Sequence, residues 1–409
     1  MPAAAAAGAG VQGAPAVAGG NPFQLATNLY AEKNVAAVNS FTTGAAQQAS
    51  GGQVNAGQYL RAVHLLLRTT TAGTVATGLP AASDFPFNIL TQVDLVNVDG
   101  SEILYPMGGF SHYLAQKYGR PWLGDPALYS DAVQSTNLVP QFTLFMQPEV
   151  RWTAGVLANT DTRSQYRFDY TLESLGNINS ANGGSYNSAS APVVSVTPYL
   201  DAWAQPDAED LQDTPNQPVP PGLNLQFKRR HQIFTMNAGG SDNIFQSALT
   251  GNALRNQILV TRNGGSARAE GLTDPILWQL DNRSLGKISV NAGAGIGTSS
   301  TSGQTGGDMV QNWMSEFYGE YFTSIATAIV GAGAPSVTVT TARREAGVYV
   351  FPRYLKPGTL YGQGWLYTAN STKEIFESSS VAGYANGTME LISDEVYPVG
   401  PVDPMLTDI

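Results

Sequence analysis

Ile89-Leu-Thr-Gln-Val-Asp94 in the first half of the chain is matched by Ile276-Leu-Trp-Gln-Leu-Asp281 in the second half. Successive side chains of a strand point to opposite faces of a sheet. In the first copy, Thr91 and Val93 are therefore predicted to face inward and Asp94 outward. In the second copy, Trp278 takes an inward position. A slip of one residue would invert every side chain, so the shared phase predicts that one strand-forming unit occurs twice.

The segments around the two copies follow the same order. Each copy is preceded by an apolar run that ends in arginine and is followed by an amphipathic helix pattern that ends in Tyr-Gly. Apolar residues recur every three or four positions in both helix patterns, at Phe110, Leu114 and Tyr118 in the first and at Val310, Trp313, Met314 and Phe317 in the second. Gly119 and Gly319 suit the left-handed conformation that often ends a helix.

Strand patterns dominate the chain after Phe41. The clearest is Tyr166–Glu173, in which Tyr166, Phe168, Tyr170 and Leu172 share one face. Further strands are predicted at 142–146, 192–200, 347–351 and 360–367. Many short strands with turn-rich connections and one inserted helix per half predict an all-β chain of two tandem antiparallel jelly-roll sandwiches.

Composition changes along the chain set the predicted boundaries. The Ala/Gly/Pro-rich start cannot pack and is expected to be disordered, Asn21-Pro-Phe-Gln24 has the residues that begin a helix, and a stretch rich in proline and acidic residues separates the halves. The predicted parts are a disordered arm at 1–20, an N-terminal helix at 21–40, a first jelly roll at 41–204, a linker at 205–222, and a second jelly roll with a C-terminal tail at 223–409.

The charge of the chain is low and negative. Charged residues make up 13% of the sequence, about half the share usual in soluble domains, and the net charge is −10. A protein that coats nucleic acid needs clustered Lys and Arg. The two basic clusters, Lys228–His231 and Arg343-Arg344, are short, and we interpret them as solvated strand ends or subunit contacts. No direct contact with nucleic acid is expected.

Cysteine and membrane-targeting signals are also missing from the sequence. The chain has no cysteine, so disulfides and thiolate metal sites are excluded. No stretch approaches 18 consecutive apolar residues, so no membrane span is expected. No Lys or Arg precedes Lys33, and a secretory signal needs a positive charge before its apolar core. Export by that route is not expected.

The sequence offers few residues for catalysis. Its three histidines, His64, His112 and His231, lie on a predicted strand, helix and strand start, and no pair has the spacing of a metal site. Gly293–Gly297 lacks the spacing of a nucleotide-binding loop, and the acidic residues near Asp207 lack that of a calcium loop. We therefore expect no enzyme, and assign no catalytic, cofactor-binding or metal-binding residues.

The six tryptophans allow two interpretations. They can stack on sugars or pack in the cores of the sandwiches. Core packing is favoured because Trp278 and Trp313 occupy inward positions of the repeated unit.

The strand–helix block from Phe87 to Lys117 and the late segment Ala342-Arg-Arg-Glu-Ala-Gly-Val-Tyr-Val-Phe-Pro-Arg353 give the chain a family resemblance. Two tandem jelly rolls with a helix between strands resemble the double jelly-roll major capsid proteins of tectivirus-type, membrane-containing bacteriophages and the adenovirus hexon lineage. The late segment is similar to a basic-then-aromatic strand of tectivirus coat proteins. The resemblance covers roughly residues 21 to 390 as architecture.

The resemblance implies a capsid protein, made in the host cytoplasm, whose homotrimers form pseudo-hexagonal tiles of an icosahedral virion. It implies contacts with neighbouring capsomers and with penton, minor capsid and membrane proteins, and an internal lipid membrane nearby. The family's N-terminal helix lies on the inner side, which makes candidate neighbour or membrane contacts of Phe23, Leu25, Leu29 and Tyr30.

Two other functions fit the same fold class. A two-domain jelly-roll protein can bind glycans or form a virion spike, which would leave tryptophans exposed for sugars. A tandem jelly-roll enzyme would need a bound metal or a carboxylate pair, and no such pair has a recognisable spacing here.

Overall fold

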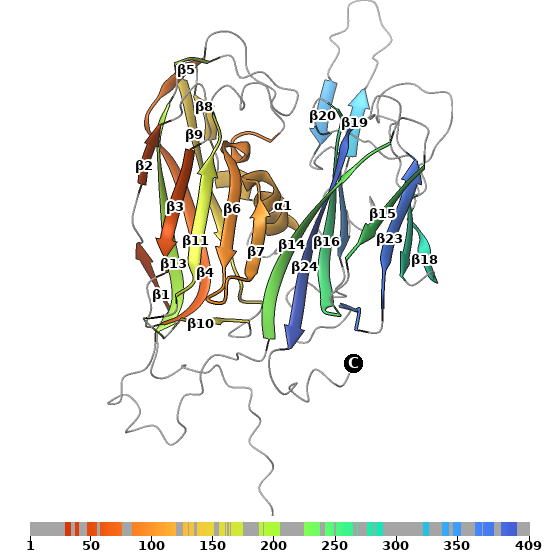
Figure 1. The fold of residues 1–409 in the computed structure, drawn as a ribbon. Helices are drawn as coiled ribbons and strands as arrows, with labels where there is room; N and C mark the ends of the chain where they lie inside the picture. Colours follow the sequence, from red (N-terminus) through yellow and green to blue (C-terminus); the bar gives the residue numbers. More distant parts are fainter. Residues whose placement is uncertain are drawn as a thin grey trace, which may run out of the picture.

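Two β sandwiches lie side by side in the computed structural model, with one helix between them (Figure 1). The residues described are 29–33, 37–40, 47–54, 58–75, 84–119, 126–129, 131–134, 137–150, 155–159, 161, 163, 165–174, 188–190, 192–204, 225–237, 242–248, 251–264, 268, 276–280, 283–288, 322–326, 338–342, 347–352, 365–369, 371–379 and 386–398. The predicted all-β class with two sandwiches is confirmed.

The first sheet belongs to the N-terminal half. Nine strands of the described residues form it, in the order β1-β13-β4-β9-β5-β12, with β2, β8 and β10 at its margins. Its strands are β1 (Leu29–Lys33), β2 (Ala37–Ser40), β4 (Gln58–Thr71), β5 (Gly73–Val75), β8 (Asp131–Gln134), β9 (Asn137–Met146), β10 (Leu157–Asn159), β12 (Ser188–Ser190) and β13 (Val193–Ala204).

The second sheet runs through both halves of the chain. Its order is β21-β16-β24-β14-β7-β6-β11-β3, and the halves meet where β7 pairs with β14 in parallel, with Leu104 opposite Arg229. Its strands are β3 (Gln47–Gln53), β6 (Leu90–Val96), β7 (Glu102–Met107), β11 (Arg167–Leu172), β14 (Leu225–Thr235), β16 (Ala253–Arg262), β21 (Val348–Pro352), β22 (Leu366–Tyr367) and β24 (Thr388–Pro398). The sandwiches therefore share one continuous sheet.

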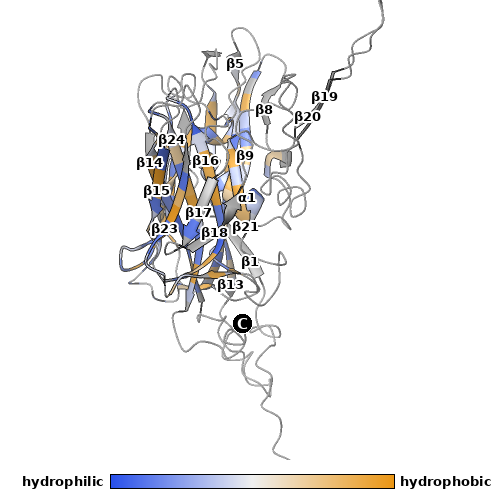
Figure 2. Cartoon of the chain, turned by 90° about the vertical axis from the view of Figure 1, so that its right-hand side faces the viewer, coloured by the Kyte–Doolittle hydropathy of each residue, from blue (hydrophilic) through white to orange (hydrophobic). Residues whose placement is uncertain are grey.

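A smaller sheet completes the second sandwich. It has the order β15-β23-β17-β18, with β15 (Asp242–Ser247), β17 (Ile276–Leu280), β18 (Arg283–Ile288) and β23 (Glu374–Ser379). In β15 every second residue is buried, which is the pattern of a strand with one face on a core, and Figure 2 shows apolar and polar residues interspersed along the neighbouring strands. A separate hairpin pairs β19 (Phe322–Ala326) with β20 (Thr338–Ala342).

The predicted side-chain phase holds for β11 but not throughout β6. Tyr170 and its partners on one face of β11 are buried, as predicted. In β6, Val93 is buried and Asp94 shares the outward face with Gln92, as predicted, although Asp94 itself is buried there, whereas Thr91 is exposed. The pairing of β6 with β11 shifts register next to Leu172, and such a bulge reverses the faces of the residues beyond it. The equivalent side chains of β17 lie outside the described residues, apart from Gln279.

The prediction of a helix at 21–40 is wrong for the residues that the structure describes. Leu29–Lys33 and Ala37–Ser40 are strands that both pair with β13. Local helix signals are weak compared with tertiary context, and here the edge of the first sheet supplies backbone partners. Residues 21–28 lie outside the described part.

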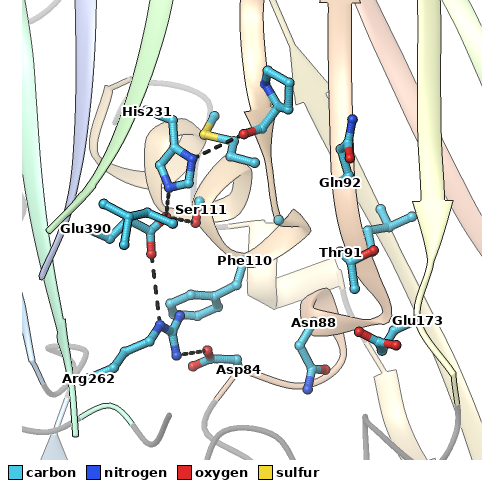
Figure 3. A pocket seen from close by; sticks show the side chains of 15 residues that line it. Asp84, Asn88, Thr91, Gln92, Phe110, Ser111, Glu173, His231, Arg262 and Glu390 are labelled. Carbon is cyan, nitrogen blue, oxygen red and sulfur yellow. Dashed lines mark hydrogen bonds and ion pairs between the residues drawn. The ribbon is translucent and has the colours of Figure 1, made fainter. Parts of the chain in front are cut away.

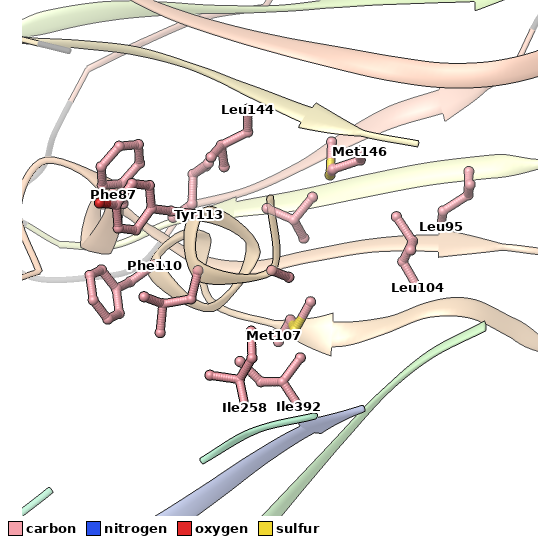
Figure 4. Packing of buried hydrophobic residues seen from close by; sticks show 14 of the residues in the cluster. Phe87, Leu95, Leu104, Met107, Phe110, Tyr113, Leu144, Met146, Ile258 and Ile392 are labelled. Carbon is pink, nitrogen blue, oxygen red and sulfur yellow. The ribbon is translucent and has the colours of Figure 1, made fainter. Parts of the chain in front are cut away.

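Helix α1 (Gly109–Gly119) confirms the predicted helix of the first half but is buried on every side. A helix buried all round lies inside a protein, and α1 lies between the sandwiches. Figure 4 shows Tyr113 beside Leu144 of the first sandwich and Met107 beside Ile258 and Ile392 of the second. The amphipathic pattern of this helix therefore does not correspond to a face that is exposed to solvent.

The left-handed conformation predicted for Gly119 is also wrong. The positive-φ glycines of the described residues are Gly100, Gly155, Gly251 and Gly347. Gly119 is needed for space instead, because a Cβ there would lie 3.1 Å from Asp394 Oδ2.

Two short 3₁₀ helices, η1 (Phe87–Ile89) and η3 (Pro126–Tyr129), complete the described elements. Several predictions fall outside the described residues: the arm at 1–20, the linker at 205–222, the second helix near Val310, Gly319, the loop at 293–297 and Arg343-Arg344. Of the predicted strands, β9, β13 and β21 are confirmed. Within 360–367 the structure describes residues 365–367, of which Leu366–Tyr367 form β22.

Candidate functional site at the junction of the sandwiches

A network of buried charges joins the start of α1 to the second sandwich. Glu390 on β24 accepts a hydrogen bond from the Ser111 hydroxyl at the start of α1. Its Oε1 lies 2.9 Å from His231 Nε2 on β14. The other ring nitrogen of His231 lies 3.1 Å from the carbonyl oxygen of Pro106, at the end of β7. Because both ring nitrogens face oxygens, the site favours the doubly protonated, positively charged imidazole.

Arg262 extends this network to the segment before α1. Its Nη1 donates to Asp84 Oδ2 at 2.6 Å, and its Nε lies 3.9 Å from Glu390 Oε2. Arg268 donates to the other oxygen of Asp84. Both guanidinium groups also lie over the ring of Phe110, at 5.8 and 4.4 Å from its centroid. The two cations are thus held between a carboxylate and an aromatic face.

A second ion pair lies at the other end of α1. Arg229 on β14 donates to both oxygens of Asp394 on β24, at 2.6 and 3.1 Å, and both side chains are buried. Arg255 on β16 donates to the carbonyl oxygen of Gly119 at 3.0 Å. Cations near the carboxyl end of a helix are favourable because the free carbonyl groups there carry partial negative charge.

The burial of these groups changes their pKa values. Burial alone would raise the pKa of Glu390, but hydrogen bonds and the positive charges of His231 and Arg262 outweigh it and lower the pKa to about 2. Burial alone would lower the pKa of His231, but Glu390 outweighs it and raises the pKa. For His112, inside α1, burial and the positive charge of Arg229 outweigh the opposing effect of Asp394 and lower the pKa to about 3. Neutral His112 donates from Nε2 to the carbonyl oxygen of Val93 at 3.0 Å.

A pocket of about 430 Å³ opens beside this network (Figure 3). His231, Glu390 and Arg262 line one side, Thr91 and Gln92 of β6 line the other, and the start of α1 lies behind. The pocket is therefore built from both halves of the chain.

The structure changes the interpretation of the basic cluster Lys228–His231. The prediction of solvated strand ends or subunit contacts is wrong for Arg229, Arg230 and His231, because these three residues face carboxylates of the same chain. Lys228 lies over the ring of Tyr105 instead. Arg230 lies 3.3 Å from Glu395, and the cluster includes Arg229 and His231 of the networks above. The carboxylates lie about 160 residues further along the sequence, and no local pattern indicated them.

The remaining histidine also has a partner. His64 Nε2 on β4 lies 2.7 Å from Asp201 Oδ2 on β13, and its ring packs against Phe145. The predicted contact residues divide into two groups. Phe23 and Leu25 lie outside the described residues, whereas the backbones of Leu29 and Tyr30 belong to β1.

The junction brings together opposite charges rather than a reactive group. In the described part of the chain no cluster of three or more His, Asp or Glu residues could hold a metal ion. Trp203 is buried, and its Nε1 donates to Glu149 at 3.3 Å, so this ring is not a platform for sugars. No helix among the described residues has the length and apolarity to span a bilayer. What the junction can do is hold two sandwiches in one orientation.

Comparisons with known proteins find relatives in structure only. No protein-family model and no curated protein matches the chain. The crystal structure of the STIV major capsid protein matches with a TM-score of 0.55 and 11% identity, over 90% of this chain and 96% of that chain. A structure of Sulfolobus Turreted Icosahedral Virus gives a TM-score of 0.55 and 11% identity, over 90% of both chains.

A third match comes from another virus. The capsid protein VP54 of PBCV-1, fitted into a reconstruction of the virophage Sputnik, gives a TM-score of 0.53 and 11% identity, over 92% of this chain and 98% of that chain. All three alignments extend over both sandwiches rather than over one. The chain therefore has the fold of the double jelly-roll major capsid proteins of icosahedral viruses.

Proposed function

We propose that this chain is a major capsid protein, and that its role in the virion is structural rather than enzymatic. The observation that carries the proposal is the match of both sandwiches, in tandem, to viral capsid proteins over nearly their full length. The junction supports it. A capsid tile must keep its shape under contact from all sides, and a shared sheet with a buried helix joins the halves firmly.

The proposed assembly is a homotrimer that presents six similar sandwiches as a pseudo-hexagonal tile. Such tiles would contact neighbouring capsomers and penton and minor capsid proteins, in a virion made in the host cytoplasm. Obligate interfaces of this kind commonly bury more than about 2,000 Å², and a charged content of 13% favours faces that are covered. The net charge of −10 fits a shell separated from the genome by an internal membrane.

We assign the segment around β1 to contacts with a neighbour or with that membrane. β1 is the last strand of its sheet, beside β13, and an edge strand offers backbone groups to another chain. Leu29 and Tyr30 lie on β1, and Phe23 and Leu25 precede it.

Native mass tests the assembly. Light scattering after size exclusion should give a species of three times 43.2 kDa, or a shell, that persists on dilution. The double variant Leu29→Asp/Tyr30→Asp should lower the mass. Val98→Asp, at an exposed apolar residue of the β6–β7 turn, is the matched control and should not. A stable monomer of the unmodified chain would contradict the proposal.

A further inference from the structure

The pocket at the junction lies where the shared sheet lacks a strand. β7 ends at Met107, opposite Val93 of β6, and the chain then turns into α1. β6 continues to Leu90 and β14 continues to Thr235. Among the described residues, no strand lies between these two ends, although each is paired on its other side. The edges of β6 and β14 thus face each other across the pocket.

Two side chains at this gap lack a partner in the described part of the chain: one is a buried amide without hydrogen bonds, and the other is an apolar side chain exposed to solvent. Neither the amide nitrogen nor the amide oxygen of Asn88 has a hydrogen-bond partner, although both atoms are buried. Ile233 on β14 is 62% exposed, which is unusual for a β-branched residue in the middle of a sheet. Both residues line the pocket. An amide that can donate and accept, beside an uncovered apolar side chain and free strand edges, fits an extended peptide.

The pocket also limits the side chains of such a peptide. Its volume of about 430 Å³ is small for a chain segment, and Phe110 and Ser111 at the start of α1 close its back. Of the charged groups around it, Glu390 is matched by His231 and Asp84 by Arg262, and the carboxylate of Glu173 accepts a hydrogen bond from the backbone N–H of Ser174. A charged peptide would bury an unpaired charge, which is costly. Small, uncharged residues are therefore preferred.

One segment of this chain has that composition. Residues 1–20 contain only Met, Pro, Ala, Gly, Val and Gln. Between Pro2 and Pro15 every residue has a backbone N–H to donate. Val11 can cover the exposed side chain of Ile233, and the amide of Gln12 can form hydrogen bonds with that of Asn88. The 28 residues before β1 can span about 90 Å when extended, which is enough to reach another molecule.

We propose that the pocket binds the N-terminal arm, residues 1–20, of a second copy of this chain as a short strand beside β14. The arm would continue the line of β7, parallel to β14. This inference rests on the proposed function, because assembly brings the copies together. It adds a contact between subunits that lies at the junction of the two sandwiches rather than at the outer edge of a subunit.

Disulfide trapping tests the proposal, and no native disulfide can interfere because the chain has no cysteine. One protein carries Ile233→Cys and the other Val11→Cys, so a disulfide between these positions can form only between molecules. The two are mixed, assembled and oxidised, and the linked peptides are identified by mass spectrometry. Ile244→Cys is the matched control, because Ile244 is 66% exposed but lies on the smaller sheet.

The disulfide between the Ile233→Cys and Val11→Cys proteins is expected to form at least about ten-fold faster than the control disulfide, because a bound arm has a millimolar effective concentration. Equal rates in an assembled sample would overturn the proposal and leave the capsid function intact. A disulfide that forms only when both substitutions are in one chain would assign the pocket to the chain's own arm and also overturn it. Thr91→Cys, on the opposite wall, replaces Ile233→Cys if that variant does not fold. Loss of assembly itself is measured separately, by light scattering.

Discussion

Replacing Glu390 by glutamine is expected to weaken the junction in a pH-dependent way. The variant keeps the size of the side chain but removes the negative charge that faces His231 and Arg262. The pKa of Glu390 falls from its ordinary value of 4.5 to about 2 in the folded protein. A change of this size corresponds to about 3 kcal/mol of folding free energy.

The sign of the pH dependence follows from the direction of each shift. A carboxyl with a lowered pKa stabilises the fold above its unfolded pKa, and the effect is lost as pH falls. A histidine with a raised pKa stabilises the fold below its unfolded pKa, and the effect is lost as pH rises through the folded value. Glu390→Gln should therefore cost about 3 kcal/mol between pH 5 and 6.5, and only about 1 kcal/mol at pH 3.

Urea unfolding followed by tryptophan fluorescence, at one protein concentration and several pH values, measures this difference. Asp161→Asn is the control, because Asp161 pairs with Arg163 at an exposed site and surface pairs contribute about 0–1 kcal/mol. A loss for Glu390→Gln that is the same at pH 3 and pH 6 would refute the electrostatic explanation and indicate a packing defect.

Three further substitutions test other parts of the fold. Asp94→Asn should stabilise the protein by roughly 1–2 kcal/mol at pH 7.5 and have no effect below about pH 4, because burial and the carboxylate of Asp169 on β11 raise the pKa of Asp94 to about 6. Solvent at the outer face of the sheet screens the charge and keeps the gain small. Urea titrations at both pH values measure the difference. Gly109→Ala should cost about 1–3 kcal/mol or more in thermal unfolding because its Cβ would collide with a backbone oxygen, whereas Gly108→Ala makes only ordinary contacts. Asp394→Leu should cost about 3–5 kcal/mol, and adding Arg229→Met should recover most of it; no recovery in a double-mutant cycle would contradict the ion-pair explanation.

Elements with regular alternation were predictable from the sequence, and elements set by distant partners were not. The face of β11 that contains Tyr170 follows from local pattern alone. The reversal at Thr91 depends on a bulge against β11. β1 depends on β13, more than 160 residues away, and only the folded chain provides that partner.

The junction was the least predictable part. The cluster Lys228–His231 was visible as charge, but its burial depends on Glu390 and Asp394 of β24. Ser111 and Asp84 gave no signal at all, because a single polar residue near a helix start has many possible roles. The gap in the sheet depends on where β7 ends relative to its two neighbours, which is a property of register between strands rather than of any one stretch.

The position of α1 also sets an order for folding during synthesis. The helix is complete once residue 119 has left the ribosome, but strands β16 and β24, which cover one of its sides, end at Arg262 and Pro398. Domains of many proteins fold one after another as they are made. Here Ser111 and Phe110 lack their contacts with Glu390 and Arg262 until β16 and β24 have been translated. A fragment that lacks the second half would therefore expose side chains that the second sandwich normally covers, and it would tend to aggregate rather than fold as a separate domain.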